Sequence, residues 1–346
     1  MPLHFNKVTQ FLLLLLQRCK LLIVICNMEF GNQTFLNYFI LIGLPQNLQI
    51  SVLLFFVFIL IYTLTVVGNS FLICAIIISP KLHTPMYYFL CNLAFIDLSY
   101  PSSTLPKMLL DMFSKRRTIS IIGCLTQMNT TLFLGSTLCI LLAVMAYDRY
   151  IAIRFPLHYA EIMNWRTCKI ITVILWSGSF LVATMPIIAR PLVFCRENIL
   201  DHFACEVLVL LEVACGDLSF YKITMFVASL FTLVTPFIFI VVSYICILVS
   251  ILKIHSAGGR SKAFSTCASH LTVVLLIYGT SMIMYMGQTK SFSSNLKYIA
   301  LIYVLVTPVL NPLIYSLRNN EVKKAFRTIL TKYSSSRIVQ SFHNAS

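Results

Sequence analysis

The stretch Ser51–Ile78, SVLLFFVFILIYTLTVVGNSFLICAIII, decides the fold class because none of its residues is charged. A helix needs about 20 apolar residues to cross a bilayer, and this stretch is longer than that. The chain has 346 residues, of which 59% are hydrophobic and 11% are charged. Soluble domains carry about 25% charged residues, so this chain lacks the charge to cover a soluble surface. We therefore expect lipid to surround much of it.

Six more apolar runs follow the first one, and no long polar segment separates them. They are Met86–Leu105, Ile121–Tyr147, Ile170–Ala189, Ile223–Leu252, Ala263–Thr289 and Tyr298–Leu317. Over residues 320–331, apolar residues recur at helical spacing with Lys and Arg between them, which is typical of a helix lying on a membrane surface. The sequence predicts an all-α membrane protein: a seven-transmembrane helix bundle with a short amphipathic eighth helix.

Lys and Arg are more numerous in the loops on one side of the predicted bundle, and such an excess marks the cytoplasmic side. We therefore expect an extracellular N-terminus over residues 28–50, a membrane domain over 51–317, and an amphipathic helix with a cytoplasmic tail over 318–346. Residues 1–27 are a doubtful extension because they do not follow the order of a signal peptide. We hypothesise that translation starts, or the mature protein begins, near Met28, just before the glycosylation acceptor Asn32-Gln33-Thr34.

The net charge of +15 is spread between the apolar runs rather than gathered in one domain or stripe. A basic balance can indicate either a nucleic-acid partner or an anionic membrane surface. Because the basic residues lie in loops at the predicted membrane face, they favour membrane lipid as the partner and argue against nucleic acid.

Three polar side chains, Asn69, Asp97 and Asn311, lie inside apolar runs at similar depth. A charged residue such as Asp97 costs roughly 2.5–3.5 kcal/mol there on insertion scales, and polar residues within the bilayer are rare, so each of the three is a functional candidate. The three could share a polar network that switches between states, or form a static cluster that only fixes packing. Pro312, directly after Asn311, removes a helical hydrogen bond and predicts a kink or hinge.

Asp148-Arg149-Tyr150 ends the third run at its predicted inner face. Arg149 stays protonated at any physiological pH, and the neighbouring Asp148 can hold it as an ion pair. Such an Arg can swing from its local partner to a protein that docks from inside, which points to signalling. Arg and Tyr also serve as interfacial anchors, and the triplet alone does not separate the two roles.

Of the twelve cysteines, four lie on the predicted outer side: Cys124, Cys195, Cys205 and Cys215. The extracellular space is oxidising, so disulfides are expected, and four cysteines allow three pairings. The chain has no CxxC pair, and a lone His202 near a disulfide cysteine is a poor ligand set. We expect neither a metal site nor a cofactor.

A transporter or channel and a membrane enzyme are two functional classes that a bundle of this kind can serve. Transporters often contain paired repeats and midplane charges, whereas this chain has no repeat and one isolated midplane acid, Asp97. An enzyme would need clustered His, Asp or Glu, or an activated nucleophile, and the His residues here lie in loops or at the ends of runs. The pattern therefore argues against both of these classes.

Several motifs taken together resemble the olfactory (odorant) receptors, a family of rhodopsin-like G-protein-coupled receptors. They are Gly68-Asn69, KLHTPMYY (81–88), MAYDRY (145–150), PLHY (156–159), KAFSTCASHL (262–271) and PVLNPLIYSLRN (308–319). The resemblance runs in order from residue 28 to about residue 330. The runs LHTPMYY and KAFSTCASHL are the most specific ones. The three spaced loop cysteines are similar to those of the tetrapod-type class.

The resemblance implies a plasma-membrane receptor for a small volatile odorant that activates a stimulatory heterotrimeric G protein. It implies the disulfides Cys124–Cys205 and Cys195–Cys215, and a polar network of Asn69, Asp97 and Asn311. It gives coupling and switch roles to Asp148, Arg149, Tyr150, Tyr244, Asn311, Pro312 and Tyr315. Ligand contacts would come from the third, fifth and sixth runs: Thr131, Leu132, Gly135, Ser136, Ser229, Thr232, Leu233, Tyr278, Ser281, Met282 and Tyr285. A chemoreceptor that works outside the nose is an open alternative.

The outer halves of the third, fifth and sixth runs contain no acid or base. An ionised ligand would lose its hydration there without gaining a partner, so we expect a neutral, largely apolar ligand. Many members of the resembling family have Glu where this chain has Leu138, and their sodium site uses that carboxylate near Asp97. We therefore expect sodium dependence to be weaker here.

Overall fold

The structure, a computed structural model, describes residues 37–44, 47–195, 198–253, 257–286, 296–317, 322 and 324. The predicted extension 1–27, Asn32 and nearly all of the predicted eighth helix over 320–331 lie outside these residues. Tyr315 belongs to the last helix, but its side chain also lies outside the described part.

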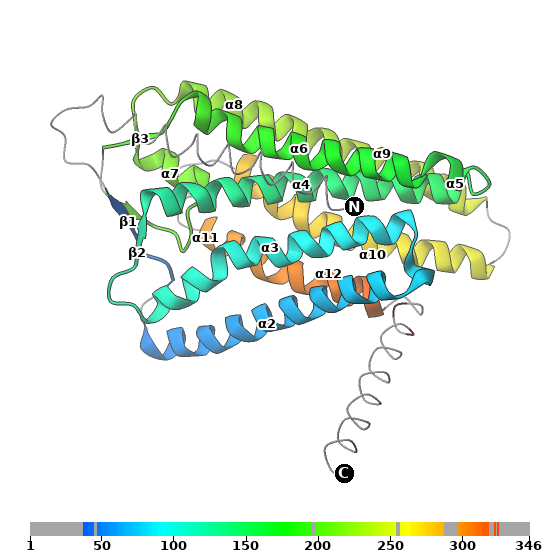
Figure 1. The fold of residues 1–346 in the computed structure, drawn as a ribbon, viewed down its shortest axis with the longest axis horizontal. Coiled ribbons are helices and arrows are strands. Elements are labelled where there is room, and N and C mark those ends of the chain that lie inside the picture. The colour runs from blue at the N-terminus through cyan, green and yellow to red at the C-terminus, as the bar shows by residue number, and fades with distance from the viewer. Residues whose placement is uncertain are drawn as a thin grey trace, which may run out of the picture.

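In the described part of the chain, seven long helical segments run along the long axis of the molecule (Figure 1). They are α2 (Leu48–Ile78), α3 (Pro85–Phe113), α4 (Ile121–Arg154), α6 (Trp165–Ala189), the run α8 (Ser219–Ser229), η2 (Leu230–Val234) and α9 (Thr235–Leu252), α10 (Ala257–Met286), and the run α11 (Leu296–Leu301), η4 (Ile302–Val306) and α12 (Thr307–Leu317). Helix α4 is central, because it packs against α3, α6, α9 and α10. Each segment matches one apolar run, so the seven-helix prediction is confirmed.

The outside of the bundle is apolar. Among the described residues, five segments are long and apolar enough to cross a membrane: α2, α4, α6, α8–α9 and α11–α12. Helix α3 contains Asp97, Lys107 and Asp111, and the apolar part of α10 is shorter. Large side chains on the outer faces are open to the surroundings, and Phe56 on α2 is 63% exposed. Apolar exposure over whole helices fits a lipid environment and not an aqueous one.

Polar residues at the helix ends explain where several helices begin. The side-chain oxygens of Asn47, Ser120 and Asn164 accept backbone N–H groups at the starts of α2, α4 and α6. Helices α3 and α4 continue past the apolar runs that predict them, to Phe113 and Arg154. Apolar length detects only the lipid-covered part of a helix, so it misses the polar turns that extend beyond it.

Short strands gather at one end of the bundle, on the left of Figure 1, which we call the sheet end. They are β1 (Tyr38–Leu41), β2 (Thr118–Ser120), β3 (Val193–Phe194), β4 (Ile199–Leu200) and β5 (Ala214–Cys215), with the helix α7 (Val207–Val213) among them. Strand β1 pairs antiparallel with β2 and parallel with β4, and β3 pairs antiparallel with β5. The opposite end, which carries α5 (Tyr159–Ile162) and the 3₁₀ turn η1 (Pro80–Leu82), is called the α5 end.

Two disulfides, Cys124–Cys205 and Cys195–Cys215, fasten the sheet end. The first joins the start of α4 to the segment before α7, and the second lies beside the β3–β5 pair. These are the two pairs that the family resemblance implies. The first disulfide holds the long connection between α6 and α8 against α4, and the second closes a loop within that connection.

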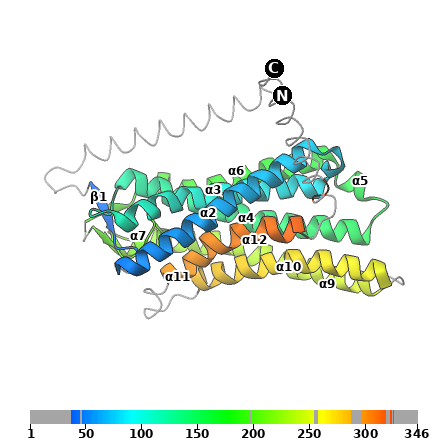
Figure 2. The ribbon, with the colours of Figure 1, turned by 90° about the horizontal axis from the view of Figure 1, so that it is seen from below.

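Helix α2 is locked against α12, and the two lie side by side in Figure 2. In an α-helix the N–H of residue 312 would bond to the carbonyl of residue 308, but Pro312 has no N–H. The side chain of Asn69 replaces that donor, since its Nδ2 donates to the Pro308 carbonyl oxygen at 3.0 Å. The absence of a side chain at Gly68 lets the Pro312 ring approach, because a Cβ there would lie 3.2 Å from Pro312 Cγ.

A second polar contact joins α12 to α3. Asn311 Nδ2 donates to Asp97 Oδ2 at 2.8 Å, and both residues are buried together with Asn69. The three polar residues therefore meet on α12, but Asn69 reaches this helix through the Pro308 backbone and not through the Asp97 carboxylate.

Replacing Asn69 by Ala should leave the Pro308 carbonyl buried without a donor and destabilise the fold by about 1–3 kcal/mol. The same change should cost much less in a Pro312→Ala background, because an alanine at position 312 supplies the missing helical N–H. Thermal unfolding of the four proteins of this double-mutant cycle, purified in detergent, measures the difference. Equal losses in both backgrounds would contradict the assigned role of Asn69.

Candidate functional site

At the α5 end, the acid of the Asp148-Arg149-Tyr150 triplet has a partner other than the expected one. Tyr159 Oη, in α5, donates to Asp148 Oδ1 at 2.7 Å, and Asp148 is buried. Among the described residues no ion pair joins Asp148 to Arg149. Successive residues on a helix point in different directions, so Asp148 faces α5 while Arg149 is half-buried beside it. The expected ion pair is therefore wrong for this structure, and no carboxylate of the described residues forms an ion pair with Arg149.

Two further residues that the resemblance singles out lie near this end. Tyr244 on α9 stacks on His270 of α10 with ring centroids 5.8 Å apart, and its hydroxyl lies 2.6 Å from His270 Nδ1. Tyr150 makes an edge contact with Phe155 just after α4 ends. The Tyr244–His270 pair joins α9 to α10, the two helices whose α5-end termini flank residues 254–256.

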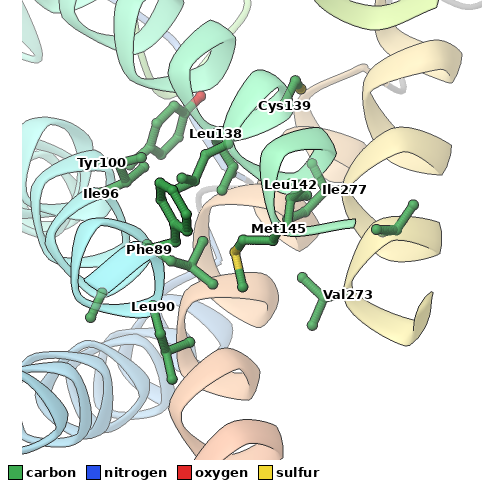
Figure 3. Close-up of a cluster of buried hydrophobic side chains, with 14 of the residues drawn as sticks. Phe89, Leu90, Ile96, Tyr100, Leu138, Cys139, Leu142, Met145, Val273 and Ile277 are labelled. Atoms are coloured by element: carbon green, nitrogen blue, oxygen red, sulfur yellow. The ribbon is translucent and has the colours of Figure 1, made fainter. Parts of the chain in front are cut away.

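The centre of the bundle is apolar and offers little to a cation. In Figure 3, Leu138 on α4 packs among Ile96 and Tyr100 of α3 and Leu142 of α4. The carboxylate of Asp97 already accepts a hydrogen bond from Asn311. Among the described residues no group of three or more His, Cys, Asp or Glu could hold a metal ion. A sodium site of the kind that uses a second carboxylate at position 138 does not fit these residues.

The expected ligand residues lie on α4, η2 with the end of α8, and α10, and these segments pack against one another. The buried members are Thr131, Thr232, Leu233, Tyr278 and Ser281; the partly exposed members are Leu132, Gly135, Ser136, Ser229, Met282 and Tyr285. We call this meeting of α4, η2 and α10 the three-helix junction. It brings residues far apart in the sequence into one region on the sheet-end side of the Asp97–Asn311 contact.

Several hydroxyl groups of the three-helix junction are already engaged. Thr131 and Thr232 donate to carbonyls of their own helical segments, and Tyr278 donates to the Cys139 carbonyl at 2.7 Å. The last of these bonds ties α10 to α4 at the inner limit of the junction. Pro236 cannot donate to the carbonyl of Thr232, and the chain just before it widens into the π-helix η2.

Two tyrosines that the sequence analysis did not single out extend the junction towards α3 and η4. The rings of Tyr100 and Tyr303 meet edge to face with centroids 4.9 Å apart. A Cβ on Gly135 would lie 3.0 Å from the Tyr303 hydroxyl, so this glycine leaves the space that the hydroxyl occupies. Both tyrosines lie in apolar runs, where spacing alone does not separate a junction residue from a core residue.

An acid reaches the three-helix junction from the loop before α7. Tyr285 Oη donates to Glu206 Oε1 at 2.9 Å, and Glu206 is only partly exposed. The third, fifth and sixth helical runs contain no acid or base in this half, as expected, but Glu206 brings an ionisable group to the junction from outside these runs. The family resemblance contained a sign of this position, because it implies the Cys124–Cys205 disulfide. Glu206 directly follows Cys205, so this disulfide brings Glu206 to the start of α4.

Two ionisable groups of this loop, His202 and Glu206, make stability depend on pH in opposite directions. Burial raises the pKa of Glu206 from 4.5 to about 7, although the Tyr285 hydrogen bond opposes the shift. Between these values the folded protein holds a proton that the unfolded chain releases, so stability falls as pH rises. Burial lowers the pKa of His202 from 6.5 to about 4. The unfolded chain holds the extra proton between those values, so this contribution to stability rises with pH.

Glu206→Gln should remove the contribution to stability that decreases as pH rises, and leave the contribution of His202, which increases with pH. The unfolding temperature of the variant should then increase from pH 4.5 to 6.5 more steeply than that of the wild type. The difference in unfolding free energy across this window should be on the order of 2 kcal/mol. Thermal unfolding of both purified proteins over the same pH series tests this, and parallel curves would refute the assignment.

Comparison with known proteins agrees with this arrangement. The sequence matches the family model of olfactory receptors over residues 58–333. Human olfactory receptor 13F1 is 46% identical over 304 residues, which cover 87% of this chain and 95% of that receptor. Human olfactory receptor 2A12 is 44% identical over 307 residues, covering 88% and 99%. Mouse olfactory receptor 2A7 is 43% identical over 302 residues, covering 87% and 97%. The chain therefore belongs to the olfactory receptor family.

Proposed function

We propose that the protein binds a small, largely apolar, neutral odorant at the three-helix junction and then activates a stimulatory heterotrimeric G protein. The observation that carries the proposal is the olfactory receptor match over residues 58–333, which spans nearly the whole bundle. Members of this family are signalling receptors, so the protein is a receptor and not an enzyme.

The contacts along the bundle support a route from the ligand to the G protein. A ligand between α4, η2 and α10 would press on the helices that the Tyr278–Cys139 bond ties together. Movement of α10 would change the Tyr244–His270 contact at the α5 end. Arg149 lies on α4 near the same end, and no described carboxylate forms an ion pair with it, so its guanidinium can pair with a docking protein. The Asp97–Asn311 contact joins α3 to α12 between the three-helix junction and the α5 end, so it would link movement at the ligand to movement at the G-protein side.

We place the sheet end outside the cell and the α5 end in the cytoplasm, with the receptor in the plasma membrane. The two disulfides at the sheet end support this orientation, because disulfides form in oxidising compartments. The proposal includes an extracellular N-terminus over residues 28–50 with a glycan on Asn32. It also includes a membrane domain over 51–317 and a lipid-bound amphipathic helix and tail over 318–346.

Cells that express residues 28–346 should raise cyclic AMP in response to at least one member of a panel of neutral volatile odorants. Arg149→Ala should abolish the response, because it removes the cation proposed to contact the G protein. Arg154→Ala is the matched control, since it removes a positive charge from the exposed end of the same helix and should keep the response. A response that survives in Arg149→Ala at equal surface expression would refute the coupling role.

Replacing external sodium by an organic cation should change the odorant response of the wild type less than twofold. Leu138→Glu should increase the effect of sodium, because it places a second carboxylate in the apolar layer near Asp97. Dose–response curves for cyclic AMP in the two media measure both. Strong sodium dependence of the wild type that Leu138→Glu leaves unchanged would count against the expectation that Leu138 weakens sodium binding.

A further inference from the structure

The loop acid Glu206 is held over the three-helix junction by several independent contacts. Cys205, the preceding residue, forms a disulfide with Cys124 at the start of α4. The backbone N–H of Cys205 donates to Gln127 Oε1 at 2.9 Å, and Gln127 Nε2 donates to the Ser103 carbonyl at 2.8 Å. The backbone beside Glu206 is thus tied to both α4 and α3, which fixes the point from which its side chain reaches Tyr285.

The carboxyl group of Glu206 points into aromatic surroundings. Tyr285 donates to it, and this tyrosine packs against both the main apolar cluster of the bundle and the smaller one at the sheet end. The carboxylate also interacts electrostatically with Tyr100 and Tyr303. A group in this position lies on the boundary between the junction and the loops that cover it.

No positive side chain among the described residues pairs with Glu206. At the sheet end, Lys107 pairs with Asp111, Lys297 pairs with Asp201, and Arg117 donates to the Ile42 carbonyl. An anionic ligand in the junction would therefore meet a negative charge in poorly hydrated surroundings, and no cation in the described part of the chain pairs with that charge to offset the repulsion.

Hydrogen bonding separates the remaining ligand classes. Burial brings the pKa of Glu206 to about 7, so both its protonation states are populated at neutral pH. A carbonyl accepts a hydrogen bond from the protonated acid only, and an ammonium group pairs with the carboxylate only. An aliphatic hydroxyl donates to the carboxylate and accepts from the acid, so it can bind either state.

We propose that Glu206 determines the specificity of this receptor, favouring small aliphatic alcohols and rejecting carboxylic acids of the same chain length. The proposal rests on the odorant-binding function and deepens it by naming the ligand class. Glu206 acts by direct contact with the ligand hydroxyl, while Gln127 and the Cys124–Cys205 disulfide position it.

The test uses the full chain in the cyclic AMP assay with straight-chain primary alcohols, and with the aldehyde, carboxylic acid and amine of each matching length. The wild type should respond to an alcohol at a concentration at least tenfold lower than the matching acid. Glu206→Gln should lower the potency of the alcohol about tenfold, because its neutral amide is a weaker acceptor than a carboxylate, and should raise that of the acid. Asp201→Asn removes a charge from an exposed acid of the same loop and should change neither.

The outcomes separate this inference from the proposed function. A wild type that answers a matching acid or amine at lower concentration than the alcohol overturns the inference without needing any variant. Silence towards every alcohol, with a response to another odorant, overturns it and leaves the receptor function standing. Silence of the surface-expressed receptor towards alcohols and the whole odorant panel counts against both. An unchanged ratio of alcohol to acid potency in Glu206→Gln shows that the acid does not select the ligand.

Discussion

One backbone carbonyl, that of Pro308, sets the arrangement of the first and last helices. Pro312 has no N–H to donate to this carbonyl, and lipid contains no hydrogen-bond donor to replace it. The donor therefore has to come from a neighbouring helix. Asn69 supplies it, and Gly68 allows the close approach that brings Asn69 within reach. With α12 held against α2 in this way, Asn311 is presented to Asp97 on α3. The hydrogen bond that Pro312 removes from α12 thus explains why α2, α3 and α12 are joined.

The two ends of the bundle are held together by different kinds of interaction. Covalent bonds and strand pairing fasten the sheet end, where Cys205 and Gln127 fix the loop that carries Glu206. The α5 end relies on side-chain contacts, such as those of Tyr159 with Asp148 and of Tyr244 with His270. Side-chain hydrogen bonds can exchange partners without breaking the chain's covalent framework. This difference suits the proposed function, in which the ligand binds near the sheet end and the G protein docks at the α5 end.

The sequence predicts the number and order of the helices because lipid imposes a length and a composition that few other environments require. It also predicts that Asn69, Asp97 and Asn311 are buried together, since polar groups in lipid have to find partners. The partner of Asp148 is missed because Tyr159 lies in a separate turn of helix that apolar patterning does not detect. Glu206, Tyr100 and Tyr303 are missed because their importance comes from contacts between distant segments. The strands escape notice because each has only two to four residues.

The pairing of β1 with β4 has a consequence for how the receptor is made. Ile40 pairs with Ile199, and α2, α3, α4 and α6 all lie between them in the chain. A ribosome releases residue 40 long before residue 199, so β1 has to wait, with one edge unsatisfied, while these helices enter the membrane. Contacts of such long sequence separation form late in folding. Membrane insertion of the early helices is therefore a separate event from completion of the sheet end. A chain whose helices have inserted, but whose β1 and β4 have not yet paired, is not fully folded.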